Sequence, residues 1–173
     1  MPVGLVLSII AADRPGLVQI LSEAVAAHGG NWIDSSMARL GGEFAGIVLV
    51  EVPEGSVAGL EAALAVLGER GISVTAKRSD GTVAPAGHAA LLELTGGDHP
   101  GIVRDISAAL ARHGASIDEL ETHVFTGSMS GEALFQAKAR ILIPEKLSTD
   151  RLREDLEDIA QDVMVDIVLK DAD

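Results

Sequence analysis

The stretch "DRPGLVQILSEAVAAHGG" at residues 13–30 occurs a second time, as "DHPGIVRDISAALARHGA" at residues 98–115. At this offset of 85 residues nine positions are identical, beginning with Asp13 on Asp98. The offset then grows to 91, which aligns Phe44 with Phe135, because the second copy carries six additional residues around 126–131. The chain is therefore an internal duplication, and one repeat is the unit whose fold has to be explained.

Each repeat reads as strand, helix, strand, strand, helix, strand. Apolar residues recur at helical spacing over 15–28, where Asp13 is the expected N-cap, Pro15 lies in the first turn and Gly29 ends the helix. The remaining elements of the first repeat are predicted at 3–11, 31–40, 43–52, 57–67 and 72–78. The prediction is an α+β protein of two tandem ferredoxin-like βαββαβ domains, with antiparallel sheets and helices on one face. Its domains span 1–82 and 88–173, joined by a linker at 83–87.

Alternation along the third strand separates the two repeats. In the first repeat Phe44, Val48 and Val50 are expected to face the helices, and Ala45, Ile47 and Leu49 to form the opposite face together with Val6 and Ile10. In the second repeat that opposite face reads Gln136, Lys138 and Arg140. Because exposed apolar strips mark contact surfaces, we expect the first repeat to meet another subunit or the other half of the chain, most simply in a homodimer.

Composition excludes several classes of protein. The formal net charge is −13, and residues 84–173 contribute −9 of it, so the Lys and Arg cluster that a duplex-binding surface needs is missing. No apolar run approaches the roughly 20 residues that span a bilayer. With neither cysteine nor a basic N-terminal leader, the chain is expected to be cytoplasmic, without contact to membrane or nucleic acid.

At this point the sequence resembles a known family. "DRPG" between strand and helix, followed by "NWI" at 31–33, resembles the ACT domain, a small amino-acid-sensing module. "IDSSMARLGGEF" at 33–44 and "MSGE" at 129–132 resemble the glycine cleavage system transcriptional repressor family, whose members are two tandem ACT domains. The resemblance covers nearly the whole chain.

The duplicated turn has the chemistry of an amino-acid site. A helix N-terminus offers free N–H groups to a carboxylate, Gly16 permits close approach, and Asp13 can accept an ammonium group. The resemblance implies that the first-turn residues and an asparagine on the next strand line such a site. The residues so assigned are Asp13, Arg14, Gly16, Leu17 and Asn31 in the first repeat, and Asp98, His99, Gly101 and Ile102 in the second. Ser116 stands where the second repeat would need the asparagine.

A structural alternative stays open for each turn, because Asp-x-Pro-Gly also makes an ordinary connection between a strand and a helix. Asn31 favours the ligand site in the first repeat, and its absence favours the structural alternative in the second. His28 and His113 are expected to cap helix ends rather than bind metal. The acidic residues of the last helix are expected to form a solvated face: Glu154, Asp155, Glu157, Asp158 and Asp162.

We find no nucleophile, phosphate-binding loop or dinucleotide-binding motif, so no enzymatic activity and no cofactor are expected. The resemblance implies a regulator that binds a small amino acid, glycine above all, and that controls a transcriptional activator by protein contact. The alternative is an allosteric, amino-acid-binding subunit of a metabolic enzyme.

Overall fold

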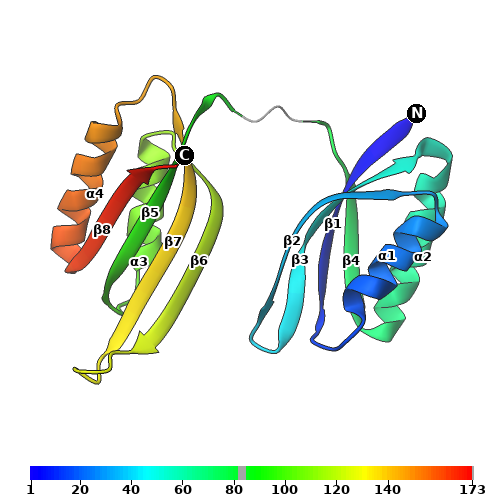
Figure 1. Ribbon diagram of the computed structural model, residues 1–173, viewed down its shortest axis with the longest axis horizontal. Helices are drawn as coiled ribbons and strands as arrows, with labels where there is room; N and C mark the ends of the chain where they lie inside the picture. The colour runs from blue at the N-terminus through cyan, green and yellow to red at the C-terminus, as the bar shows by residue number, and fades with distance from the viewer. Residues whose placement is uncertain (82–84, 173) are drawn as a thin grey trace. The chain divides into compact units, whose positions relative to one another are not determined.

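The computed structural model describes residues 1–81 and 85–172. The chain divides into two compact units, Met1–Val83 and Ala84–Asp173. Each unit is one four-stranded antiparallel sheet with two helices packed on one of its faces (Figure 1). The predicted linker at 83–87 falls partly on residues 82–84, which lie outside the described residues.

The first unit follows the predicted element order closely. Its sheet has the order β2-β3-β1-β4, with every neighbouring pair antiparallel. In this order the first strand, β1, lies inside the sheet, and β2 and β4 form its two edges. The elements are β1 (Pro2–Ala12), α1 (Leu17–Ala27), β2 (Asn31–Leu40), β3 (Glu43–Pro53), η1 (Glu54–Ser56), α2 (Val57–Leu67), η2 (Gly68–Arg70) and β4 (Ile72–Arg78).

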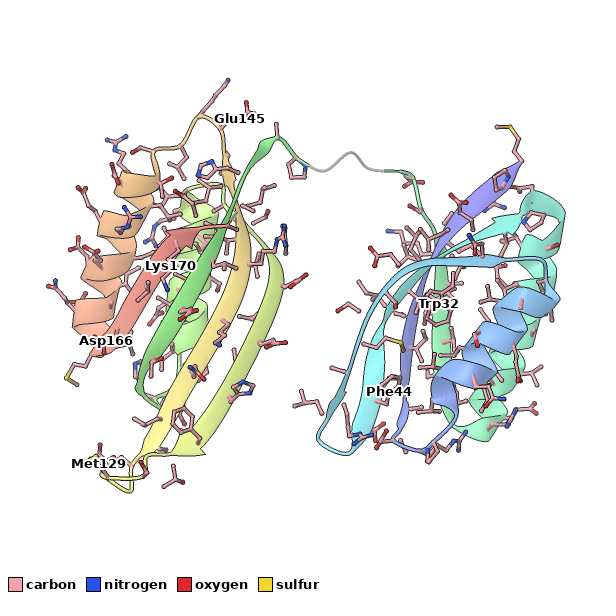
Figure 2. All side chains as sticks on the ribbon, in the orientation of Figure 1. Trp32, Phe44, Met129, Glu145, Asp166 and Lys170 are labelled. Atoms are coloured by element: carbon pink, nitrogen blue, oxygen red, sulfur yellow. The ribbon has the colours of Figure 1, made fainter. Side chains whose placement is uncertain are left out.

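The second unit repeats this topology with the sheet order β6-β7-β5-β8. The six additional residues lengthen the β6–β7 hairpin, and Figure 2 shows Met129 at the tip of that hairpin, where its side chain is fully exposed. The elements are β5 (Gly87–Gly97), α3 (Ile102–Arg112), β6 (Ser116–Thr126), β7 (Ala133–Pro144), α4 (Thr149–Val163) and β8 (Val165–Asp171). Both units therefore have the βαββαβ arrangement that the sequence predicts.

Each unit buries its own aliphatic core between the sheet and the helices. In the first unit Val48 and Val50 of β3 are buried, whereas Ile47 between them is 55% exposed. In the second unit Phe135, Ala139 and Ile141 take the buried positions of β7. The alternation predicted for the third strand of each repeat is confirmed.

Helix α1 begins two residues later than predicted, and the predicted N-cap is wrong. Gly16 is the capping residue, at φ 88° in the left-handed region that favours glycine, and no side chain caps the helix. Pro15 precedes the helix, and Asp13 instead forms an ion pair described below. Gly101 caps α3 in the same left-handed conformation, at φ 97°.

The equivalent edge strands β2 and β6 each contain a β-bulge near their start. The pairing of β2 with β3 shifts between Trp32 and Asp34, and that of β6 with β7 shifts between Ile117 and Glu119. Because each bulge inserts one unpaired residue, it reverses the alternation of faces along the rest of the strand. In β2 the bulge places Trp32 and Met37 on the same, helix-facing side.

Candidate functional site

The β1–α1 turn is fixed to the sheet by its backbone. The N–H of Asp13 donates a 2.9 Å hydrogen bond to the carbonyl of Gly42, at the tip of the β2–β3 hairpin. The guanidinium of Arg14 donates to the carbonyl of Arg70 in η2, also at 2.9 Å. The turn is thus held from both sides, which fixes where the N-terminus of α1 points.

The carboxylate of Asp13 pairs with Arg39, a residue that the sequence prediction missed. Arg39 Nε lies 2.6 Å from Asp13 Oδ2, and the Asp13 side chain keeps 26% of its surface exposed. Arg39 reaches the turn because it pairs with Phe44, which in turn lies opposite Ala11 at the end of β1. The sequence of the "LGGE" hairpin does not reveal this ion pair by itself, because recognising it requires the register of three neighbouring strands.

The N-terminus of α1 is open beside this ion pair. The first helical hydrogen bond runs from Ile20 N–H to the Gly16 carbonyl at 3.0 Å, so the N–H groups of the preceding three residues have no partner within the helix. A methyl group built on Gly16 would meet no atom within 4 Å. Leu17 turns its side chain into the core, where it is 3% exposed. An anion can therefore approach the helix end next to both a carboxylate and a guanidinium.

Asn31 does not lie at this turn. It begins β2 opposite Glu51, in the row that includes Gly4, whereas Asp13 follows the last residue of β1. Gly4 and Asp13 are nine residues apart along the chain, or about 31 Å at a rise of about 3.4 Å per residue. Asn31 instead borders a shallow depression with Gly29 near the C-terminal end of α1. Within one unit, Asp13 and Asn31 cannot contact the same small ligand.

The corresponding turn of the second unit is built differently. The N–H of Asp98 donates to the carbonyl of Ala133 at 2.9 Å, which reproduces the backbone anchor. Val124 occupies the position of Arg39, and among the ion pairs of residues 1–81 and 85–172 none involves Asp98. Its carboxylate therefore lacks the guanidinium that Asp13 has.

The helix end of the second unit is also more crowded. A methyl group built on Gly101 would lie 2.9 Å from the guanidinium of Arg104, which pairs with Asp105 at 2.8 Å and lowers the pKa of that carboxyl by donating a hydrogen bond to it. His99 Nδ1 lies 3.2 Å from the carbonyl of Pro100. Ser116 begins β6, at the far end of the sheet from Asp98, just as Asn31 does in the first unit. The two turns therefore have similar backbone conformations, but different side chains surround the two helix N-termini.

The second unit has an apolar pocket on the helix side of its sheet. It lies between α3 and the strands β6 and β7, and Ile117 and Leu120 at its mouth are 36% and 47% exposed. In the first unit Trp32 and Met37 are partly buried and pack against the core. The aligned residues of the second unit are Ile117, which lines the pocket, and Thr122, which does not. In the sequence, the signal for this pocket is that Ile117 stands where the first repeat has Trp32, the one tryptophan of the chain.

The predicted capping histidines differ from each other. His28 Nδ1 donates to the carbonyl of Ala24 at 2.8 Å, as a helix cap should. His113 Nε2 instead donates to Asp155 on α4 at 2.9 Å, and Arg112 bonds the same carboxylate oxygen at 3.2 Å. These two bonds lower the pKa of Asp155. Asp155 is therefore a link between the two helices and not part of a solvated face.

Comparison with known proteins places this architecture in a family. The family model of the ACT domain matches residues 4–74 and again residues 88–170, one match in each unit. The chain belongs to the ACT domain family. The two units are accordingly its first and second ACT domains, and the β1–α1 and β5–α3 turns are equivalent positions of the two domains.

Individual relatives agree with this assignment. The chain is 30% identical over 118 residues to the glycine cleavage system transcriptional repressor of Escherichia coli, a match that covers 67% of this chain and 62% of the relative. A solved structure of a protein of unknown function from Galdieria sulphuraria is 32% identical and superposes with a TM-score of 0.85 over the full length of both chains. A further solved structure, assigned provisionally to the glycine cleavage system transcriptional repressors, is 20% identical with a TM-score of 0.72 over 98% of this chain and 97% of its own. The last supports the shared fold alone.

None of the helices within residues 1–81 and 85–172 combines the length and the apolar content that crossing a membrane requires. In the same residues, no group of three or more His, Asp or Glu side chains is placed to hold a metal ion.

Proposed function

We propose that this protein is an amino-acid-sensing regulator whose ligand site is the β1–α1 turn of the first ACT domain. In this proposal Asp13, Arg14, Gly16, Leu17 and Arg39 form the site. The equivalent turn of the second domain, with Asp98, His99, Gly101 and Ile102, binds the same ligand weakly or not at all.

The ion pair between Asp13 and Arg39 carries the proposal. An α-amino acid is a zwitterion, so its ammonium group fits the Asp13 carboxylate while its carboxylate fits Arg39 and the free N–H groups at the start of α1. Both side chains remain partly exposed, with 26% of Asp13 and 71% of Arg39 accessible, so a ligand reaches them without unfolding the turn. The second domain lacks this arrangement because Val124 replaces the arginine.

Glycine is the ligand that we propose to test first. The open space above Gly16 shows no wall that would recognise a particular side chain, which favours an amino acid recognised by its backbone groups alone. The relative from Escherichia coli is named for the glycine cleavage system, although this match spans only 62% of that relative's length. By this analogy the partner is a transcriptional activator of that system, reached by protein contact.

The test is capture of partners from an extract of the source organism, with this protein immobilised and with or without glycine. We expect a DNA-binding regulator to be recovered, in an amount that glycine changes, because linkage requires ligand and partner to alter each other's affinity by the same factor. A typical coupling of about 1–3 kcal/mol corresponds to roughly 5- to 150-fold. Recovery of a metabolic enzyme would support the allosteric-subunit alternative. Recovery that no amino acid changes would refute the sensing role.

A further inference from the structure

The first ACT domain has a second surface with a definite pattern, on the face of its sheet opposite α1 and α2 (Figure 1). Side chains of this outer face lie in rows that cross the four strands. Ile47 and Ile10 at its centre are 55% and 50% exposed. Read from β2 to β4, the three central rows are Asp34, Leu49, Val6 and Lys77; Ser36, Ile47, Ser8 and Thr75; and Ala38, Ala45, Ile10 and Ser73.

Only two of these twelve side chains are charged, and they stand at opposite edges of one row. Asp34 is on the β2 edge, Lys77 is on the β4 edge, and Leu49 and Val6 lie between them. The outer face of the second domain is different, because its equivalent rows contain Glu119, Arg140 and Lys170, and Glu121, Lys138 and Glu93. Figure 2 shows Lys170 on this second sheet. Covering the apolar rows with that charged face would strip its charges of water without pairing them.

We infer that the outer face of the first ACT domain binds the same face of a second copy of this chain, about a two-fold axis parallel to the strands. Such an axis keeps each row in place and exchanges its two ends. Asp34 of one copy then faces Lys77 of the other, and Lys77 faces Asp34. A single surface thereby supplies both halves of two ion pairs, as an isologous dimer requires.

The same operation fits large side chains against small ones. Ile47 on β3 comes opposite Ser8 on β1 of the other copy, and Ile10 comes opposite Ala45. Two twisted sheets pack in this aligned manner at about 30° with interdigitated side chains. The pattern of the rows is therefore complementary to itself in shape as well as in charge.

The other possible two-fold axis in the plane of the contact runs across the strands, and the charges exclude it. That axis would reverse the order of the rows and leave every strand opposite itself. Glu51 at one end of β3 would then face Glu43 at the other end, while Asp34 would face Ala38 and lose its partner. With the axis along the strands, Glu51 faces Gly4 and Glu43 faces Ala12 instead.

The size of the face is sufficient for a weak but specific dimer. Four strands about 4.8 Å apart and five rows about 6.8 Å apart give a face of about 19 Å by 34 Å, roughly 650 Å². Two copies then bury on the order of 1,300 Å², in the lower part of the range for specific interfaces, so we expect a dimer that dissociates in the micromolar range.

The test is sedimentation of complementary charge variants. Asp34→Lys alone places two lysines at each end of the shared row, and Lys77→Asp alone places two aspartates there, so each variant should dimerise at least about tenfold more weakly than the wild type. An equimolar mixture of the two restores both ion pairs, so we expect a heterodimer close to wild-type affinity. Ile47→Lys, which places a charge in the apolar centre, should abolish the dimer of any copy that carries it.

Leu91→Lys is the matched control, because Leu91 occupies the position of Val6 on the second domain's sheet and should leave association unchanged. Circular dichroism melts establish that each variant is folded. A wild-type chain that remains monomeric at high micromolar concentration would overturn the inference. So would a dimer that the single charge variants do not weaken, or a mixture that is no more associated than its components.

Discussion

At the scale of single residues, the first turn depends on one glycine, which the second turn shares, and on one ion pair, which the second turn lacks among the described residues. Gly16 adopts φ 88°, and the space where a side chain would begin is empty. Asp13, freed from the capping role that the sequence predicts, bonds Arg39 instead. The conformation of the turn and the charge beside it are therefore set by different residues, and they can be altered separately.

Gly16→Ala tests the conformational part. A methyl group meets no atom there, but the left-handed backbone costs a residue with a Cβ about 1–2 kcal/mol, so we expect the first domain to lose stability by about 1 kcal/mol. Gly55→Ala is the control, because its methyl group is equally unobstructed and its backbone does not have positive φ. Chemical denaturation of both variants measures the difference. Equal stabilities would show that the left-handed conformation carries no cost at this turn.

At the scale of elements, much of the fold could be predicted from the sequence. The periodicity gave the strands and helices within about two residues, because apolar spacing and the paired "HG" helix ends are local signals. Two features depend on partners distant in the chain and were not predicted: the Asp13 to Arg39 pair and the bulge after Trp32. The start of α1 at Leu17, two residues later than predicted, follows instead from the local conformation of Gly16. The distance from Asp13 to Asn31 follows from topology, since β2 begins where α1 ends, at the far end of the sheet from the β1–α1 turn.

The helix pair of the second domain gives a prediction about pH. Because hydrogen bonds from His113 and Arg112 lower the pKa of Asp155, its stabilising effect is present above the unfolded pKa, near 3.8, and is lost as the pH falls through the lower folded value. Asp155→Asn should therefore lower the free energy of unfolding at neutral pH by less than about 1 kcal/mol for this partly exposed group, and lower the melting temperature accordingly. The deficit should shrink below about pH 4.

Asp158→Asn is the control for that experiment, because Asp158 is exposed on the same helix. Its substitution removes one negative charge but leaves the hydrogen bonds from Arg112 and His113 to Asp155 in place. Thermal melts of both variants across the acid range make the comparison. A deficit of Asp155→Asn that persists unchanged at pH 3, or that Asp158→Asn reproduces, would contradict the role assigned to the carboxylate.

The apolar pocket of the second domain can be filled by copying the first. Ile117→Trp places the ring of Trp32 at the equivalent position, and covering the exposed apolar side chains beside it should stabilise the domain by up to about 1 kcal/mol. Ser116→Trp adds the same ring on the neighbouring residue, which points to the opposite face, and should not stabilise. A lower melting temperature for Ile117→Trp would indicate that the pocket cannot accept the ring.

At the scale of the whole molecule, the net charge bears on whether this protein can bind DNA directly. The net charge is −13, and both halves of the chain are acidic. Since duplex binding depends on neutralising phosphates, we expect no mobility shift of promoter DNA by this protein alone at physiological salt. With the activator present, the protein should change the activator's shift in an amino-acid-dependent way. Tight binding of the isolated protein to that DNA would refute regulation through a partner.

The central claim is that an amino acid binds at the turn of Asp13, and calorimetric titration of three proteins with the twenty amino acids tests it most directly. We expect the wild type to bind one small amino acid, glycine first among them. Asp13→Ala should bind it about ten- to a hundredfold more weakly, since a hydrogen bond to a charged group contributes about 1.5–3 kcal/mol. Asp98→Ala, the same change in the second domain, should bind like the wild type. Binding that Asp13→Ala leaves intact, or that Asp98→Ala removes, would contradict the account.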